Sequence, residues 1–283
     1  ELDFSNNNFS TLDVGVFEGL AKLESLTLLS NPIRELPPGL LNGLSNLQLL
    51  DLGSTLLTTL PAGLFTGLDN LVVLDLRRSQ LSTLPAGVFA GLSSLRSVSL
   101  LKNFLQTLPE GIFQELPSLV GLNLMDNRLS ELPARLFDRL PALKNLHLNS
   151  NKLASLPDVL FAGLISLRTL DLSSNRILAL PVGLFDDLPA LHTLDLSSNQ
   201  ISMLPLGLFD SLAGLRTLNL TSNRLAVLPA GLFDGLVGLQ VLDLRNNPLS
   251  TLPADLFAGL HSLRHVCLNS NSSCMDWRLS WDG

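Results

Sequence analysis

The chain has 283 residues, a net charge of −7 at pH 7 and a sequence pI of about 5.0. No basic stripe follows the sequence, which disfavours nucleic acid as a partner. Apolar residues make up 46% of the chain, yet no stretch reaches the roughly 18 uninterrupted apolar residues of a membrane-spanning helix. We therefore expect a region that is not membrane-spanning and that buries its apolar residues internally.

A unit of 24 residues recurs along the chain, and Leu167 to Ala190 is a clear copy of it. Sliding the sequence by one unit superposes Leu170 on Leu146 and on Leu194. A fixed period of this size is the signature of a solenoid, in which stacked coils bury the apolar face that one coil cannot bury alone. Length by itself would suggest two domains, but the unbroken repeat predicts one solenoid of about twelve coils over residues 1–271.

Each unit predicts a short strand, a turn and an extended return segment. The alternation from Leu170 to Leu172 is typical of a strand with one buried face. Asn175 follows where the chain turns off the strand, and an inward amide there can pair with backbone groups of neighbouring coils. Pro181 favours an extended return segment over a helix, and Phe185 closes the core.

The turn position forms a column through the whole repeat, and we number the coils by it from 1 to 12. Thr55 and Ser79 occupy this position in coils 3 and 4, and they lack the second arm of an amide. We therefore predict a structural ladder of inward asparagines that is weakest in these two coils. The asparagines are Asn7, Asn31, Asn103, Asn127, Asn151, Asn175, Asn199, Asn223, Asn247 and Asn271.

A second column carries phenylalanine in all but one of its copies, where Leu41 stands instead. A column of aromatic residues at constant spacing indicates core packing rather than a cofactor site. Its phenylalanines are Phe17, Phe65, Phe89, Phe113, Phe137, Phe161, Phe185, Phe209, Phe233 and Phe257.

The coils differ in the residues that the alternation points toward solvent. Coils 8 and 9 both read DLSSN from strand to turn, whereas coils 2 to 7 carry apolar and basic residues there. A contiguous exposed apolar patch usually marks an interface, although scattered surface leucines are also common. We predict a partner-binding surface on coils 2 to 7 with these residues: Leu29, Leu49, Val73, Arg77, Arg78, Leu101, Lys102, Phe104, Met125 and His147.

Residues that could support catalysis are sparse. The chain has four histidines, no Gly-rich phosphate loop and no serine nucleophile motif. We therefore expect no enzyme activity, no cofactor and no metal. A column of outward aspartates could offer a surface for a cation or a basic ligand, or it could be ordinary for such repeats: Asp3, Asp51, Asp75, Asp171, Asp195 and Asp243.

Both cysteines lie near the C-terminal end. The alternation predicts that Cys267 faces outward on the last strand. A closed loop of eight residues could join it to Cys274, and the alternative is two free thiols. A disulfide would indicate an oxidising compartment, since such bonds rarely persist in the cytosol.

Three N-x-S/T sequons occur, at Asn8, Asn219 and Asn271. Asn271 belongs to the ladder and should be buried. Asn219 should project from the strand face, where a glycan would cover part of the sheet. Asn8 and Asn219 are thus candidate glycosylation sites, with chance occurrence as the alternative.

The repeating pattern L-x-x-L-x-L-x-x-N-x-L-x-x-L-P-x-x-x-F-x-x-L resembles the 24-residue class of extracellular leucine-rich repeats, as in variable lymphocyte receptors, Slit, the Nogo receptor and Toll-like receptor ectodomains. The resemblance covers nearly the whole chain. It implies an α/β-type solenoid, a horseshoe with one parallel β-sheet on the concave face and irregular or 3-10 segments on the convex face. In the family the last repeat leads into a cysteine-rich cap. Here Trp277 replaces its second cysteine, so residues 272–283 predict a degenerate or truncated cap.

Together these features predict a non-enzymatic receptor-type module of the secretory pathway or cell surface. It would bind a protein or glycan through the concave face of coils 2 to 7. The alternative is a structural subunit packed permanently in a wall, matrix or filament, where the interface would be larger and more apolar. Because the chain opens at Glu1 directly inside a strand, we also expect that its natural start and any targeting segment lie upstream.

Overall fold

The computed structural model describes residues 1–268 and 275–276. Its contacts divide the chain into two compact units, Glu1–Leu143 and Lys144–Gly283. The single solenoid that we expected over residues 1–271, with a cap at 272–283, stays a prediction.

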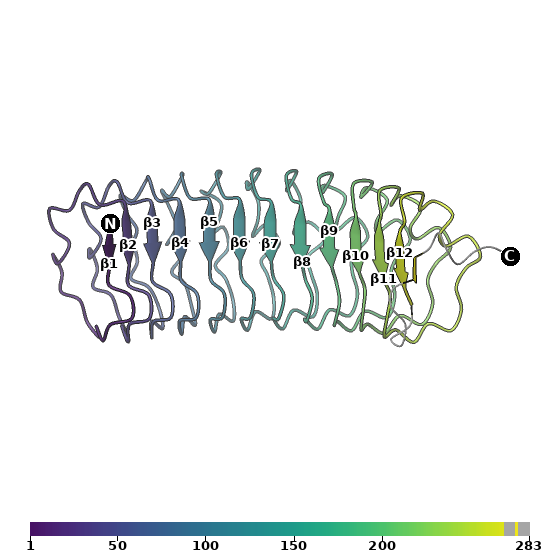
Figure 1. Cartoon of the computed structure of the whole chain (residues 1–283), viewed down its shortest axis with the longest axis horizontal. Coiled ribbons are helices and arrows are strands. Elements are labelled where there is room, and N and C mark those ends of the chain that lie inside the picture. The colour runs from purple at the N-terminus through teal and green to yellow at the C-terminus, as the bar shows by residue number, and fades with distance from the viewer. Residues whose placement is uncertain (269–274, 277–283) are drawn as a thin grey trace. The chain divides into compact units, whose positions relative to one another are not determined.

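In the first unit six short strands lie side by side in chain order (Figure 1). All neighbouring pairs are parallel with a register of one repeat, so that Leu26 pairs with Leu50 and Leu50 with Leu74. The strands are β1 (Leu2–Asp3), β2 (Ser25–Thr27), β3 (Leu49–Asp51), β4 (Val73–Asp75), β5 (Ser97–Ser99) and β6 (Gly121–Asn123).

The second unit repeats this arrangement and ends differently. Strands β7 to β12 pair in parallel with the same register, but β13 pairs antiparallel with β12. The strands are β7 (Asn145–His147), β8 (Thr169–Asp171), β9 (Thr193–Asp195), β10 (Thr217–Asn219), β11 (Val241–Asp243), β12 (His265–Cys267) and β13 (Met275–Asp276).

Each strand from β2 to β11 buries its middle side chain and leaves its two flanking side chains at least partly exposed. In β8, Leu170 is fully buried between the half-buried Thr169 and Asp171. Full burial of one leucine side chain stabilises a fold by about 1.5–3 kcal/mol. The repeated inward leucines therefore form a continuous core in each unit.

The chain leaves the strand region through one residue in the left-handed conformation, placed directly before the ladder position. Ser174 has a φ of 54°, and Arg78 and Lys102 adopt similar values of 53° and 56°. This conformation costs a non-glycine residue about 1–2 kcal/mol, which favours the small polar residues found in most coils. The kink directs the next residue, such as Asn175, into the interior.

The ladder asparagines bond the backbone of two successive coils. Asn175 Nδ2 donates to the carbonyl oxygens of Leu148 (3.0 Å) and Leu172 (3.1 Å), and its Oδ1 accepts from the backbone N–H of Leu153 (3.1 Å). Asn151 Nδ2 likewise donates to Leu148 O at 3.0 Å. The full three-bond pattern recurs at Asn31, Asn103, Asn127, Asn199, Asn223 and Asn247.

Coils 3 and 4 replace this pattern with a pair of hydroxyl groups. The Thr55 and Ser79 hydroxyls lie 2.9 Å apart, and Thr55 Oγ1 donates to Leu52 O at 3.0 Å. A hydroxyl has one proton to donate, whereas an amide has two. The ladder therefore loses donors in these coils, as the sequence indicated.

The return segments consist of successive β-turns that begin at the repeated proline. In coil 3 the Leu64 N–H donates to Pro61 O (3.2 Å), and Gly63 has a φ of 71° at the third position of the turn. A positive φ at that position is the mark of a type II turn and favours glycine. The described residues contain no helix, so the predicted 3-10 segments are not confirmed.

The phenylalanine column lies in the core, as predicted, from Phe17 to Phe233. In the first unit the Phe113 ring stacks between Phe89 (centroids 5.9 Å apart) and Phe137 (6.3 Å). The second unit has the same stacking from Phe161 through Phe233, with spacings of 6.1–6.3 Å. These rings fill the side of each coil opposite the strands.

Cys267 pairs in register with Asp243 of the outward column, but it is not exposed as an outward residue was expected to be. Cys267 is only 2% exposed and is disulfide-bonded, while Leu268 is 42% exposed. Cys274, Asn271 and Trp277 lie outside the described residues.

Candidate functional site

The outer face of the sheet presents three columns of side chains. The first column precedes the buried strand residue, the second follows it, and the third follows the next buried leucine. In coil 3 the three positions are held by Leu49, Asp51 and Gly53, and in coil 4 by Val73, Asp75 and Arg77.

The apolar residues predicted for binding face outward but fall into separate groups. Leu49, 37% exposed, pairs with Val73 in the first column. Leu101 and Met125 are neighbours in the third column, where the Lys102 N–H donates to Met125 O at 2.9 Å. Leu29 stands in the third column of coil 2, and Gly53 and Arg77 separate it from Leu101. The first unit thus carries two apolar pairs on opposite sides of a polar column.

Two of the three predicted cations form ion pairs on this surface. Arg77 Nε lies 3.3 Å from an Asp75 carboxylate oxygen, and Lys102 Nζ lies 3.8 Å from Asp126. Exposed pairs of this kind contribute only about 0–1 kcal/mol to stability. Arg78 is exposed and adopts the left-handed conformation. The ion pairs on this surface therefore contribute little to the stability of the fold.

Phe104 lies one residue past the ladder, and its side chain is 40% exposed. The Arg128 guanidinium carbon lies 4.3 Å from the centroid of the Phe104 ring, a cation–π contact worth about 0.5–1 kcal/mol at an exposed site. Sequence reasoning identified Phe104 and missed Arg128. The signal was available, because Arg128 holds the same position as Phe104 one repeat later.

His147 is the one predicted binding residue outside the first unit. It is half-buried in the second column of β7, at the start of the second unit. The other nine lie between Leu29 and Met125 in the first unit.

The outward aspartates have a folding role. Asp51 Oδ1 accepts the backbone N–H of Gly53 at 2.8 Å, and Asp171 accepts that of Ser173 at 2.9 Å. Asn219 makes the same bond to Thr221, so the position selects a short side-chain acceptor rather than a charge. Within residues 1–268 and 275–276, no group of three histidine, cysteine or acidic side chains could hold a metal ion.

Two of these aspartates differ in their protonation equilibria. Burial raises the pKa of Asp75, opposed by the Arg77 backbone N–H, and the nearby Asp51 raises it further. Burial also acts to raise the pKa of Asp243, but hydrogen bonds from the Arg245 side chain and backbone outweigh it and lower the pKa. The Arg245 guanidinium contacts both Asp243 oxygens, at 3.0 and 2.6 Å.

These opposite shifts predict opposite pH effects of removing each charge. Because the pKa of Asp75 is raised in the folded state, its ionisation destabilises the fold as pH rises above the ordinary pKa of 3.8. Asp75→Asn removes this ionisation, so it should increase the free energy of unfolding more at pH 7 than at pH 3. Asp243→Asn should lower it at pH 7, because the lowered pKa stabilises the fold above that range. Urea unfolding at both pH values measures this, and equal signs for the two variants would contradict it.

The two candidate glycosylation sites differ in their environments. Asn219 is half-buried, and its Nδ2 donates to Asp195 Oδ2 at 3.0 Å while its Oδ1 accepts from the Thr221 N–H. A glycan on Asn219 would break the bond to Asp195. Asn8 is exposed. Asn8 is therefore the better placed of the two, and both stay predictions.

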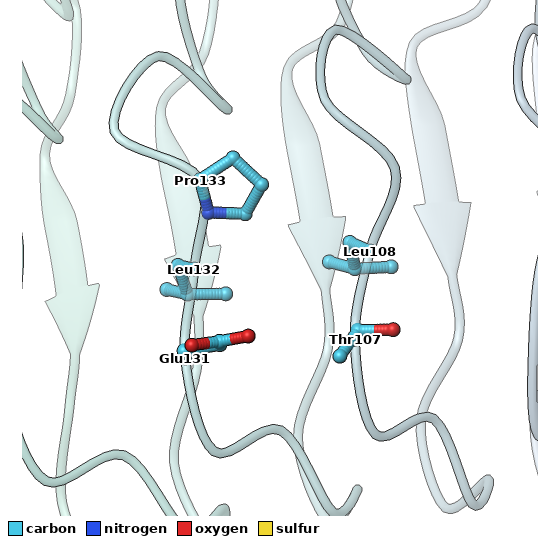
Figure 2. A pocket seen from close by; sticks show the side chains of 5 residues that line it. All are labelled: Thr107, Leu108, Glu131, Leu132 and Pro133. Carbon is cyan, nitrogen blue, oxygen red and sulfur yellow. The ribbon is translucent and has the colours of Figure 1, made fainter.

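A hollow of about 240 Å³ lies between two neighbouring return segments of the first unit (Figure 2). It is lined by Thr107, Leu108, Glu131, Leu132 and Pro133. An equivalent hollow recurs between coils 1 and 2, beside Thr11 and Glu35. The recurrence of the hollow at an equivalent place indicates a consequence of the repeat rather than a ligand pocket.

Parallel strands stacked at a register of 24 residues define a repeat solenoid of the β type. The leucine rich repeat profile matches overlapping segments of the chain, at residues 26–79, 45–103, 69–129, 93–153, 117–177, 141–201, 165–225 and 213–272. The chain therefore belongs to the leucine-rich-repeat family, which confirms the resemblance found in the sequence.

Solved structures of similar proteins include several protein complexes. A chain of the Drosophila Toll–Spatzle complex is 30% identical with a TM-score of 0.88, covering 95% of this chain and 37% of its own. A Leptospira interrogans LRR protein is 30% identical with a TM-score of 0.73, and the match covers 94% of this chain and 70% of that protein's chain. A chain of the octameric complex of Latrophilin 3, Unc5D and FLRT2 is 27% identical with a TM-score of 0.77, and the match covers 89% of this chain and 78% of the other.

The chain thus spans 37% of the length of the matched chain in the Toll–Spatzle complex. A search of curated proteins returned no significant match. In the part of the chain that the structure describes, no helix has the length and apolar character needed to cross a membrane.

Proposed function

We propose that this chain is a non-enzymatic recognition module that binds a protein partner through the outer face of its sheet. The proposal concerns coils 2 to 6 in the first unit, with His147 of coil 7 as a separate contribution from the second unit. The similar Toll and FLRT2 structures are complexes with other proteins, which supports a protein partner over a glycan.

The observation that carries the proposal is the replacement of small polar residues by large apolar ones on this face. Leu101 and Met125 occupy the third-column positions that Ser173 and Ser197 hold in the second unit. The strands form equally well with either set, so folding does not require the apolar residues. An interface does require them, because its centre is typically apolar within a polar rim. The Arg77–Asp75 and Lys102–Asp126 pairs would supply that rim.

The dimensions of the surface also suit a protein contact. Neighbouring strands lie about 4.8 Å apart, so Leu29 to Met125 spans four spacings, or roughly 20 Å. The stacked rings of Phe65, Phe89 and Phe113 lie 5.9–6.3 Å apart on the opposite side of the same coils. Coils that are thicker at the return side than at the strands support a sheet on the concave side of each unit.

The disulfide at Cys267 supports a location in the secretory pathway or at the cell surface. Disulfides persist in oxidising compartments and are rare in the cytosol.

Replacing Leu101 and Met125 by glutamate should weaken partner binding by at least about a hundredfold, equal to about 2.7 kcal/mol. Two charges would have to be desolvated at the centre of the contact. The melting temperature should hardly change, because both side chains lie half-buried on the outer face of the sheet rather than in the core. The measurement is capture of the native partner by the wild-type chain, followed by titration of each variant against it.

The matched control is glutamate at Ser173 and Ser197, the equivalent positions of coils 8 and 9. This control should bind like the wild-type chain. Retained binding by the Leu101/Met125 variant together with loss by the control would place the site in the second unit. Loss of binding after enzymatic removal of glycans from the partner would identify a glycan ligand instead.

A further inference from the structure

The second unit carries an exposed apolar surface on its return segments, away from the sheet face. In coils 8 to 10, five large apolar side chains are between 53% and 74% exposed, more than any apolar residue predicted for binding. We call them the return patch: Leu178, Val182, Met203, Leu206 and Val227. They belong to three successive coils, 8 to 10. Val182 and Leu206 hold the same repeat position in neighbouring coils, and so do Met203 and Val227.

The repeat itself does not require apolar residues at these positions. The equivalents of Met203 and Leu206 are Thr83 and Ala86 in coil 4, and Thr107 and Glu110 in coil 5. Side chains more than half exposed in five places leave on the order of 500 Å² of apolar surface, a size that commonly marks a functional contact. Coil 9 therefore exposes two large apolar side chains where coils 4 and 5 carry smaller or polar ones.

A row of carboxylates borders the patch on its C-terminal side. Each carboxylate lies close to the glycine three residues before it. A Cβ added to Gly183 would lie 3.2 Å from Asp186 Oδ2, and a Cβ added to Gly231 would lie 3.1 Å from Asp234 Oδ2. Asp210 lies against Gly207 in the same way, at 3.6 Å. Because these glycines directly follow the outer patch position of each coil, the carboxylates lie beside Val182 and its equivalents.

A row of cations borders the patch on the opposite side. Arg176 and Leu178 both point outward around the buried Ile177, as alternate residues of an extended segment do. Arg224 holds the same place in coil 10, and Lys152 in coil 7. Within the described residues, neither these cations nor Asp186 and Asp234 form an ion pair; the ion pairs of the structure lie elsewhere.

We infer that the return patch is the interface of a symmetric dimer, in which a second copy of this chain covers it. The patch has cations along one edge and carboxylates along the other, so it is complementary to itself. In a two-fold interface each surface meets its own copy. With the two-fold axis along the direction in which the coils stack, Arg176 faces Asp186 of the copy and Arg224 faces Asp234.

The charge rows select this arrangement over the other two-fold arrangement. An axis running across the coils would place Arg176 opposite Arg224 and Asp186 opposite Asp234, and such like-charge contacts disfavour association. A lipid or nucleic-acid surface would meet the acidic row with repulsion. A second copy is the partner whose charges match both rows at once.

The dimer is tested by sedimentation equilibrium of the full chain. The wild-type chain should dimerise, and Met203→Glu/Leu206→Glu should raise the dissociation constant at least a hundredfold without lowering the melting temperature. The control Thr83→Glu/Ala86→Glu introduces the same charges at the equivalent positions of coil 4 and should leave the dimer intact. A wild-type chain that stays monomeric, or a patch variant that dimerises normally, would overturn the inference.

Charge reversal tests the orientation of the two copies. Arg176→Glu alone should weaken the dimer at least tenfold, because two carboxylates then face each other. Adding Asp186→Lys in the same chain should restore the dimer to within about threefold, since position 176 of one copy meets position 186 of the other. Adding Asp234→Lys instead should not restore it. Rescue by Asp234→Lys and not by Asp186→Lys would overturn the proposed arrangement.

Discussion

Replacing Phe113 by alanine is expected to lower the free energy of unfolding by about 3–5 kcal/mol, the range for deleting a buried aromatic side chain. Its ring is fully buried and stacks on both sides, against Phe89 at 5.9 Å and Phe137 at 6.3 Å. The cavity would remove contacts in three coils at once. Because each coil is covered only by its neighbours, the surrounding stack has little freedom to close the gap.

The control is Phe104→Ala, which deletes the same side chain from a surface position in the same region. Phe104 is 40% exposed and contacts Arg128, so its loss should cost less than about 1 kcal/mol. Urea unfolding of both variants followed by circular dichroism measures the difference. Similar losses would contradict the separation of a core column from a surface column.

Asn175→Ala is expected to lower the free energy of unfolding by about 2–4 kcal/mol. The change leaves the buried N–H of Leu153 without its side-chain partner. It also removes one of the two side-chain donors to each of the carbonyl oxygens of Leu148 and Leu172, which keep the donors from Asn151 and Asn199. A buried polar group without a partner costs about 1–3 kcal/mol. The loss falls on two coils, so adjacent repeats should separate more readily in the second unit.

Arg168→Ala serves as the control, since it truncates a nearby side chain at an exposed position. Its effect on stability should stay within about 0.5 kcal/mol. Asn175→Asp adds a second comparison, because it keeps the acceptor but removes both donors and buries a charge. Amide hydrogen exchange of Leu153 should accelerate in Asn175→Ala. Unchanged exchange at Leu153 would show that the asparagine does not hold this backbone group.

Two features of the structure were not predicted although the sequence contains the patterns that indicate them. The residues of the return patch lie at exposed positions between the buried leucines and isoleucines of the return segments, and a comparison of Met203 with Thr83 and Thr107 would have revealed the patch. The left-handed residue before each ladder position was also overlooked. Its signal is the preference for serine at that position, as at Ser150, Ser174 and Ser198.

The sequence alone determined the repeat, the short strands, the aromatic core and the asparagine ladder. Each of these depends on a local alternation and on the offset of 24 residues, which specifies the neighbour of every position in the next coil. Leu170 is buried between Leu146 and Leu194 for that reason, and the sequence states it directly. The family followed from the same pattern.

Only the tertiary structure decided how the outward side chains group on the sheet face and which side chains are covered at the end of the repeat. It separated Leu49 and Val73 from Leu101 and Met125, because a polar column runs between the first and third positions of the sheet face. It showed that Cys267 is buried and disulfide-bonded although it holds the register of the outward Asp243. Such contacts depend on side-chain conformations and on chain ends, which a repeating pattern does not encode.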